Sequence, residues 1–146
     1  PDAHGPPGGV MAELTVRAEL GALAAIADFL AGTLAGSADD MVFSVQLAVD
    51  EACSNTILYG YPNREAGAIT IACTVDDDVV RVTITDDGVA FDPLTAPPPL
   101  LDIPAEERPI GGLGIHFIRT VMDNVAYARR DDRNVLSMEK RRPASG

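Results

Sequence analysis

The segment LAVDEACSNTILYGYP, residues 47–62, places a carboxylate and a carboxamide four residues apart, at Glu51 and Asn55. Positions four apart lie one above the other on the same face of a helix. The pair would therefore present one acidic and one amide group to a common ligand. The alternative is an ordinary solvated helix surface, because polar pairs at this spacing are frequent on exposed faces.

Two further segments contain glycines at places where a backbone could bind a ligand. DDGVAFDP, residues 86–93, directly follows a predicted strand, so it is either a glycine-containing turn or part of a site. GGLG, residues 111–114, precedes an apolar-periodic helix. Tight glycines before a helix N-terminus leave backbone N–H groups for a phosphate, although they also serve as a simple break before a helix. Each motif is weak when taken alone.

The elements that must position these groups show clear periodicity. Residues 11–18 alternate apolar and polar side chains, which predicts a half-buried strand, and the next segments repeat apolar residues at helical spacing. The second of these helices has an acidic start that suits the helix dipole, and Pro62 cannot continue it. Val-, Ile- and Thr-rich alternation then predicts a hairpin. The expected elements are a strand at 11–18, helices at 19–36 and 39–59, strands at 67–75 and 79–86, a helix at 111–125 and two strands within 126–141.

This order predicts an α/β two-layer sandwich in which helices cover one face of a mixed, mostly antiparallel sheet. A chain of 146 residues with 47% apolar composition is long enough for one domain with a core. We assign residues 11–142 to that domain and the Pro- and Gly-rich residues 1–10 to a flexible arm or linker. Residues 92–110 hold six prolines and no period, so they form either a functional lid or a disordered loop.

Charge and cysteine content exclude several classes of protein. The formal net charge is -11 and no basic stripe occurs before the C-terminal EKRRP, which argues against a nucleic-acid or anionic-membrane surface. No apolar run is long enough for a membrane span and no signal peptide opens the chain, so we expect a cytosolic protein. Cys53 and Cys73 lack metal-type spacing and are expected to be reduced and buried. The aspartates at 76–78 are expected to form a solvated turn rather than a cation site.

The three motifs, taken in order, resemble a known family. VDEACSNTILYGY, ITDDGVAFDP and GGLGIHFIRTVMDNV are similar to the N-box, the DxG box and the GxG box of the histidine-kinase and gyrase type of ATPase, called GHKL. Within it, the blocks most resemble the anti-sigma-factor serine/threonine-protein kinases, and the resemblance covers nearly all of residues 11–142. It implies the histidine-kinase/gyrase-type ATP-binding fold, with ATP and Mg²⁺ as ligands.

The resemblance also implies residue roles. Glu51 would be the general base, Asn55 would coordinate Mg²⁺, and Asp86 would accept a hydrogen bond from the adenine amino group. Gly88 would let the backbone pass close to the base, and residues 92–110 would close over the nucleotide as a lid. The residues that it assigns to nucleotide binding are Asn55, Asp86, Gly88, Gly112, Leu113 and Gly114.

The chain departs from the family pattern at three places. Tyr59 stands where many relatives carry a His, and Ala90 replaces the second glycine of a full DxGxG box. DDRNVLSM, residues 131–138, lacks the Gly-Thr that is common before the last strand. His116 follows the glycine turn, and we expect a packing or supporting role for it because no acid or nucleophile accompanies it in the sequence.

The resemblance predicts an ATP-binding serine protein kinase that phosphorylates a STAS-domain anti-anti-sigma factor and sequesters a sigma factor, as a homodimer. One alternative is a nucleotide-gated binding module with little or no kinase activity, and another is the ATPase domain of a larger multidomain regulator. A sensor histidine kinase is disfavoured because the residues before Met11 are too few for a phosphoacceptor hairpin. An acidic domain without a nucleotide site would require three accidental matches.

Overall fold

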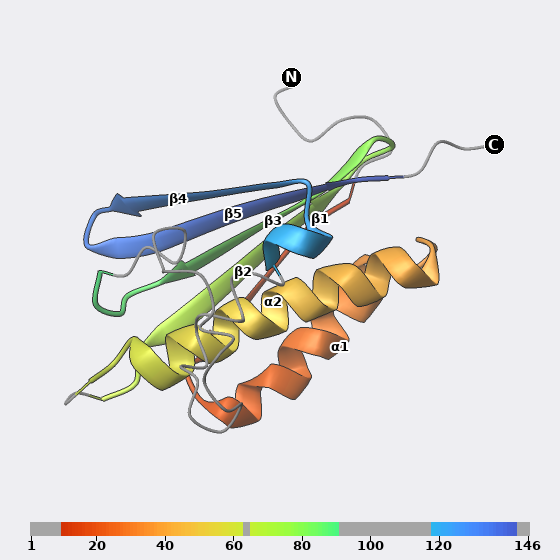
Figure 1. Cartoon of the computed structure of the whole chain (residues 1–146). Helices are drawn as coiled ribbons and strands as arrows, with labels where there is room; N and C mark the ends of the chain where they lie inside the picture. Colours follow the sequence, from red (N-terminus) through yellow and green to blue (C-terminus); the bar gives the residue numbers. More distant parts are fainter. Residues whose placement is uncertain (1–9, 63–64, 91–117, 143–146) are drawn as a thin grey trace, which may run out of the picture.

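The computed structural model describes residues 10–62, 65–90 and 118–142. A five-stranded sheet forms one layer and two helices cover one of its faces (Figure 1). None of the described helices is long and apolar enough to cross a membrane. The elements are β1 (Val10–Arg17), the 3-10 turn η1 (Leu20–Ala22), α1 (Leu23–Thr33), α2 (Asp39–Tyr59), β2 (Ala68–Val75), β3 (Val79–Asp86), β4 (Asn124–Arg130) and β5 (Arg133–Arg141).

The sheet has the strand order β1-β2-β3-β5-β4. All four pairings between described strands are antiparallel. The predicted two-layer sandwich is therefore confirmed, and no parallel pair occurs between the strands that the structure describes. Alternate residues of β3 and β5 are buried, as expected when one face is covered. In this register Ile84 pairs with Leu136 and Asp86 pairs with Asn134, so the covered face becomes polar at one end.

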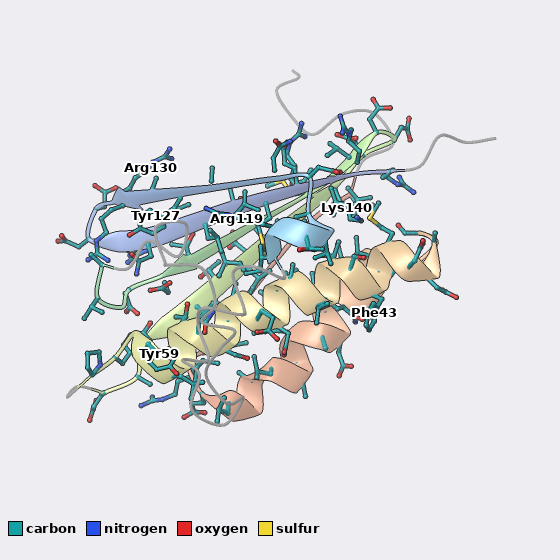
Figure 2. The ribbon with its side chains drawn as sticks, viewed as in Figure 1. Phe43, Tyr59, Arg119, Tyr127, Arg130 and Lys140 are labelled. Atoms are coloured by element: carbon teal, nitrogen blue, oxygen red, sulfur yellow. The ribbon has the colours of Figure 1, made fainter. Side chains whose placement is uncertain are left out.

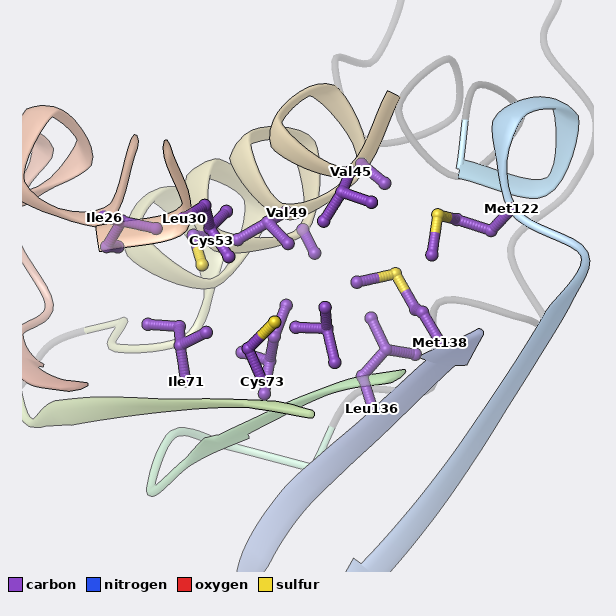
Figure 3. Close-up of a cluster of buried hydrophobic side chains, with 14 of the residues drawn as sticks. Ile26, Leu30, Val45, Val49, Cys53, Ile71, Cys73, Met122, Leu136 and Met138 are labelled. Atoms are coloured by element: carbon purple, nitrogen blue, oxygen red, sulfur yellow. The ribbon is translucent and has the colours of Figure 1, made fainter. Parts of the chain in front are cut away.

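The core lies between the sheet and the helices α1 and α2, and α2 buries one stripe of side chains against the strands (Figure 3). Val45, Val49 and Cys53 are fully buried on the helix, and Cys73 is fully buried on β2. Both cysteines are free, as predicted. Burial raises the pKa of the Cys53 thiol to about 12 and that of Cys73 to about 11, with smaller contributions for Cys53 from Asp50 and Asp86. Both cysteines are thus packing residues.

The observed element bounds agree closely with prediction for α2, β2 and β3, and the main differences lie in the first and last predicted helices. The first predicted helix begins as a 3-10 turn and becomes α-helical only at Leu23. The last predicted helix was drawn too long, because helical residues end at 121 and β4 begins at Asn124. Two contacts explain this early end: Lys140 Nζ donates to the Val121 carbonyl at 2.7 Å, and the Asp123 amide donates to the Glu139 carbonyl at 2.8 Å.

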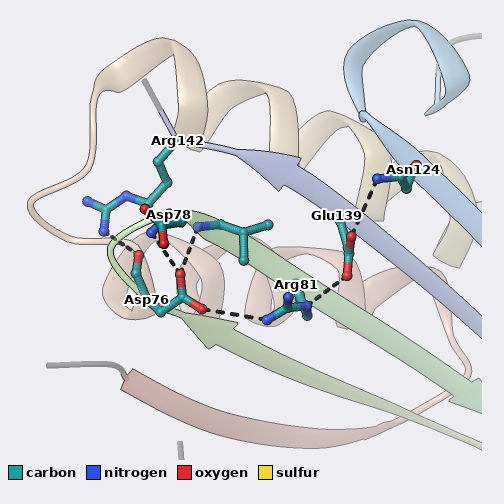
Figure 4. A network of polar contacts seen from close by, with 7 residues as sticks. Asp76, Asp78, Arg81, Asn124, Glu139 and Arg142 are labelled. Carbon is teal, nitrogen blue, oxygen red and sulfur yellow. Dashed lines mark hydrogen bonds and ion pairs between the residues drawn. The ribbon is translucent and has the colours of Figure 1, made fainter. Parts of the chain in front are cut away.

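A polar network surrounds the turn of the β2–β3 hairpin, residues 76–78 (Figure 4). Asp76 Oδ1 accepts hydrogen bonds from the amides of Asp78 and Val79, each at 2.8 Å. Arg81 Nε contacts Glu139 Oε2 at 2.7 Å, and Arg81 Nη1 lies 3.5 Å from Asp76 Oδ2. The predicted solvated turn is an ordered Asx turn, whose aspartate replaces a backbone acceptor.

Candidate functional site

A pocket opens between the C-terminal half of α2 and the polar end of the sheet. Its space is about 550 Å³ when the open mouth is included. Three elements form most of it, namely α2, β3 and the β4–β5 hairpin, and the loop after β3 adds a further wall. The lining residues are Ala52, Asn55, Thr56, Tyr59, Gly60, Ile84, Asp86, Val89, Ile118, Tyr127, Asn134 and Leu136.

Helix α2 contributes a stripe of four residues to the pocket, from Ala52 through Asn55 and Thr56 to Tyr59. Their spacing of three and four residues places them on one helical face. Asn55 is only 7% exposed, and its side-chain oxygen has no hydrogen-bond partner among the described residues. A buried oxygen without a partner is costly, so this atom is placed for a ligand that supplies a positive charge or a donor. Tyr59 is exposed at the end of α2 (Figure 2).

Strand β3 contributes a buried carboxylate, Asp86, which is 6% exposed. Its Oδ1 accepts two hydrogen bonds, from the Gly88 amide at 2.9 Å and from Asn134 Nδ2 at 2.9 Å. Within the described residues, its Oδ2 has one long contact, with Thr56 Oγ1 at 3.5 Å, and that hydroxyl also donates to the Ala52 carbonyl at 3.2 Å. A hydroxyl carries one proton, so Oδ2 remains the acceptor that can serve a ligand in the pocket.

Gly88 is required because two backbones meet there. The Val89 amide donates to the Gly60 carbonyl at 2.9 Å, which joins the loop after β3 to the end of α2. A Cβ at Gly88 would lie 2.7 Å from that carbonyl oxygen and 3.0 Å from Asp86 Oδ1. The glycine therefore fixes the distance between helix and strand on which the pocket depends.

The next aspartate, Asp87, points away from the pocket and holds the segment between α2 and β2. Its Oδ1 accepts from Tyr61 Oη at 2.7 Å and from the Ala68 amide at 3.1 Å. The hydrogen bond from Tyr61 is the largest cause that lowers the pKa of Asp87. Burial, followed by the contact with Asp87, raises the pKa of Tyr61 well above its usual range. Asp87 is thus a structural residue.

Glu51 lies one helical turn before Asn55 and is half-buried, outside the set of side chains that line the pocket. Burial raises the pKa of its carboxyl, and the neighbouring Asp50 carboxylate raises it further. A raised pKa makes the carboxylate a stronger proton acceptor, which suits a general base. Gly112, Leu113, Gly114, His116 and the predicted lid at 92–110 lie outside the described residues.

The comparisons identify relatives for nearly the whole domain. A family model described as the histidine kinase-like ATPase domain matches residues 16–140. The serine-protein kinase RsbW of Bacillus cereus is 31% identical over 114 residues, which cover 71% of this chain and 71% of the relative. RsbW of Bacillus mycoides matches with the same identity and coverage. The chain belongs to the anti-sigma-factor kinase family of the histidine kinase-like ATPases.

Solved structures support the family fold. The crystal structure of the RsbU and RsbW domains of Rv1364c from Mycobacterium tuberculosis superimposes with a TM-score of 0.64 at 16% identity. The match covers 92% of this chain and 33% of that chain, so this chain spans about a third of the longer protein. The histidine kinase domain of a blue-light activated kinase from Erythrobacter litoralis gives a TM-score of 0.54 at 17% identity.

The chemistry of the pocket fits the ligands that this family implies. Ile84, Leu136 and Val89 provide apolar walls for a flat base, and Asp86 provides an acceptor for an exocyclic amino group. The side-chain oxygen of Asn55, which lacks a partner within the described part of the chain, fits Mg²⁺, because this ion prefers oxygen ligands and keeps several waters. No group of three or more His, Cys, Asp or Glu side chains that could hold a metal occurs within the described residues. A metal there would rely on the ligand's phosphate oxygens.

The sequence patterns did not single out several residues that lie in the pocket or beside it. Thr56 shares the helical stripe of Asn55, so the spacing rule could have found it. Asn134 occupies one of the alternating buried positions of β5, where a polar residue is unusual. This polar residue at an otherwise apolar position could also have indicated a functional role. Arg129 donates from Nη1 to the Gly88 carbonyl at 2.9 Å and Tyr127 donates to Asn134 Oδ1. Those two contacts depend on strand register, which the sequence pattern did not specify.

Proposed function

We propose that the chain is an ATP- and Mg²⁺-dependent protein serine kinase that phosphorylates a STAS-domain anti-anti-sigma factor and sequesters a sigma factor, as a homodimer. The observation that carries the proposal is the presence, in one pocket, of two side chains with acceptor oxygens for a ligand. The Asn55 side-chain oxygen has no partner among the described residues, and the Asp86 carboxylate has one oxygen with only a long contact there. Relatives named serine-protein kinase, at 31% identity, support the reaction class.

Residues at one end of the pocket would bind the base, and residues on α2 would bind the metal and take the proton. Asp86 would accept a hydrogen bond from the adenine amino group, with Ile84 and Leu136 against the ring. Asn55 would hold Mg²⁺, and Glu51, one turn earlier on α2, would take the proton of the attacking serine hydroxyl. Bound Mg-ATP would supply the phosphoryl group, and its Mg²⁺ would neutralise charge on the phosphate oxygens. The roles of Gly112, Leu113, Gly114 and the 92–110 lid stay predictions.

The first experiment is calorimetric titration of the chain with ATP, with and without Mg²⁺. Wild type should bind ATP more tightly when Mg²⁺ is present, and Asn55→Ala should lose about tenfold or more of the Mg²⁺-dependent affinity. Ser54→Ala is the matched control, because Ser54 is a half-buried neighbour on α2 outside the pocket lining. If wild type does not bind ATP, the proposed function is wrong.

The binding-module alternative differs from the kinase in one measurable output. A kinase transfers labelled phosphate from ATP to the serine of a purified STAS-domain antagonist, whereas a nucleotide-gated module binds its partner without transfer. The position of Glu51, half-buried and one helical turn before Asn55, favours the kinase, because a carboxylate there could take the proton of an attacking hydroxyl. Nucleotide-dependent partner capture with no labelled serine would favour the module.

A further inference from the structure

Asn134 lies at the polar end of β5, directly opposite Asp86 in the strand register. It is 7% exposed and lines the pocket. Its Nδ2 donates to Asp86 Oδ1 at 2.9 Å and to the Val89 carbonyl at 2.8 Å. Both neighbours are acceptors without protons, so the amide nitrogen must face them and both of its protons are used. Asn134 therefore holds other groups of the pocket and has no N–H left for a ligand.

Tyr127 fixes the other end of the same amide. It lies on β4 and lines the pocket, and its hydroxyl donates to Asn134 Oδ1. With an oxygen donor at one end and two acceptors at the other, only one orientation of the Asn134 amide satisfies every partner. The network thus runs from β4 through β5 to β3 and ends at the carboxylate of Asp86.

The consequence for Asp86 is a fixed division of its two oxygens. Asn134 and the Gly88 amide occupy Oδ1, which leaves Oδ2 as the acceptor for a ligand. The same amide also holds the Val89 carbonyl, so one side chain fixes both the carboxylate and the pocket wall beside it. Without Asn134, the carboxylate would keep one donor on Oδ1 and could rotate away from the geometry that a base requires.

We propose that Asn134, oriented by Tyr127, is a positioning residue that gives the pocket its preference for a purine with an exocyclic amino group. The inference rests on the proposed function, because it assumes that Asp86 accepts from the adenine amino group. It accounts for the presence of an asparagine in DDRNVLSM, the segment at which the sequence departs from the family pattern.

The test compares two nucleotides that differ only in the amino group: ATP and purine riboside triphosphate. Titration calorimetry of Asn134→Ala should show ATP affinity reduced about tenfold, with purine riboside triphosphate affinity changed by less than about twofold. Tyr127→Phe should show the same pattern with a loss of about threefold, because the amide remains but is free to turn. Asn124→Ala, at the other end of the β4–β5 hairpin on the uncovered face, should change neither affinity.

Equal weakening of both nucleotides by Asn134→Ala and Tyr127→Phe would overturn the inference, because it would show a general structural role. Unchanged ATP binding in both variants would overturn it as well. If Asn134→Ala does not fold, Tyr127→Phe decides the question on the same pair of nucleotides. Failure of wild type to bind ATP would overturn the proposed function together with the inference. The two outcomes above concern the variants and leave ATP binding by wild type, and so the proposed function, in place.

Discussion

Two adjacent aspartates show how strand geometry separates roles that composition does not distinguish. Asp86 ends β3 on its covered face and lines the pocket, whereas Asp87 holds Tyr61 and the Ala68 amide. Asp86 occupies the last buried position of β3, whereas Asp87 follows the strand and is exposed, so only Asp86 lines the pocket. Replacement of Asp by the uncharged Asn should therefore affect ligand binding at Asp86 and local structure at Asp87.

At the residue scale, Glu51→Gln tests the general base. The substitution keeps the size of the side chain and removes its ability to take a proton, so phosphoryl transfer should fall by about 10²- to 10⁴-fold. ATP affinity, measured by calorimetry, should stay near the wild-type value because Glu51 does not line the pocket. Transfer of labelled phosphate to a STAS-domain antagonist is the measurement. Parallel loss of transfer and of ATP binding would exclude Glu51 as the base.

The pH profile supplies a control for the same residue. A base must be unprotonated, so the transfer rate should fall as the pH drops through the pKa of Glu51, which burial and then Asp50 raise. Asp50→Asn removes the second of these causes, and its acid limb should move to lower pH. An acid limb that Asp50→Asn leaves in place would mean that another group controls the rate.

At the scale of elements, the sequence was informative wherever a local rule decides the structure. The bounds of α2 followed from its acidic start and from Pro62, and the β2–β3 hairpin followed from two alternating runs around three aspartates. The contact between Asn134 and Asp86 joins residues 48 positions apart. It exists because β5 returns beside β3 in one register, a choice made by the packing of the whole sheet.

The hairpin turn makes a prediction of its own at this scale. Asp76→Ala removes the acceptor for two backbone amides, so the melting temperature at neutral pH should fall by a few degrees. These hydrogen bonds are the main cause of the lowered pKa of Asp76. A carboxyl with a lowered pKa in the folded state stabilises the fold at pH values above its unfolded-state pKa. That contribution disappears as the pH falls through the folded-state pKa.

The difference in melting temperature between wild type and Asp76→Ala should therefore narrow as the solution is acidified. Asp77→Ala is the matched control, since Asp77 is the exposed neighbour in the same turn and should change the melting temperature little. Thermal unfolding followed by circular dichroism at several pH values provides the measurement. A difference that stays constant down to strongly acidic pH would show that the Asp76 carboxylate does not stabilise the turn.

At the scale of the whole molecule, charge is distributed unevenly between the two layers. Residues 18–62, which contain α1 and α2, carry six acidic side chains and no Lys or Arg. The net charge of the chain is -11. Like charges gathered on one layer repel one another in the compact state, and dissolved salt screens that repulsion over about 10 Å at 0.1 M. The helical layer is also the face on which a basic partner would meet the least repulsion.

This distribution predicts that salt stabilises the free protein. Raising NaCl from about 50 mM to about 500 mM should increase the melting temperature, because screening relieves repulsion that the unfolded chain spreads over a larger volume. Asp28→Asn removes one exposed charge from α1. It should raise the melting temperature at low salt and have little effect at high salt. A melting temperature that falls with added salt would mean that ion pairs such as Arg81 with Glu139 outweigh the repulsion. In that case the acidic side chains of the helical layer would not destabilise the fold.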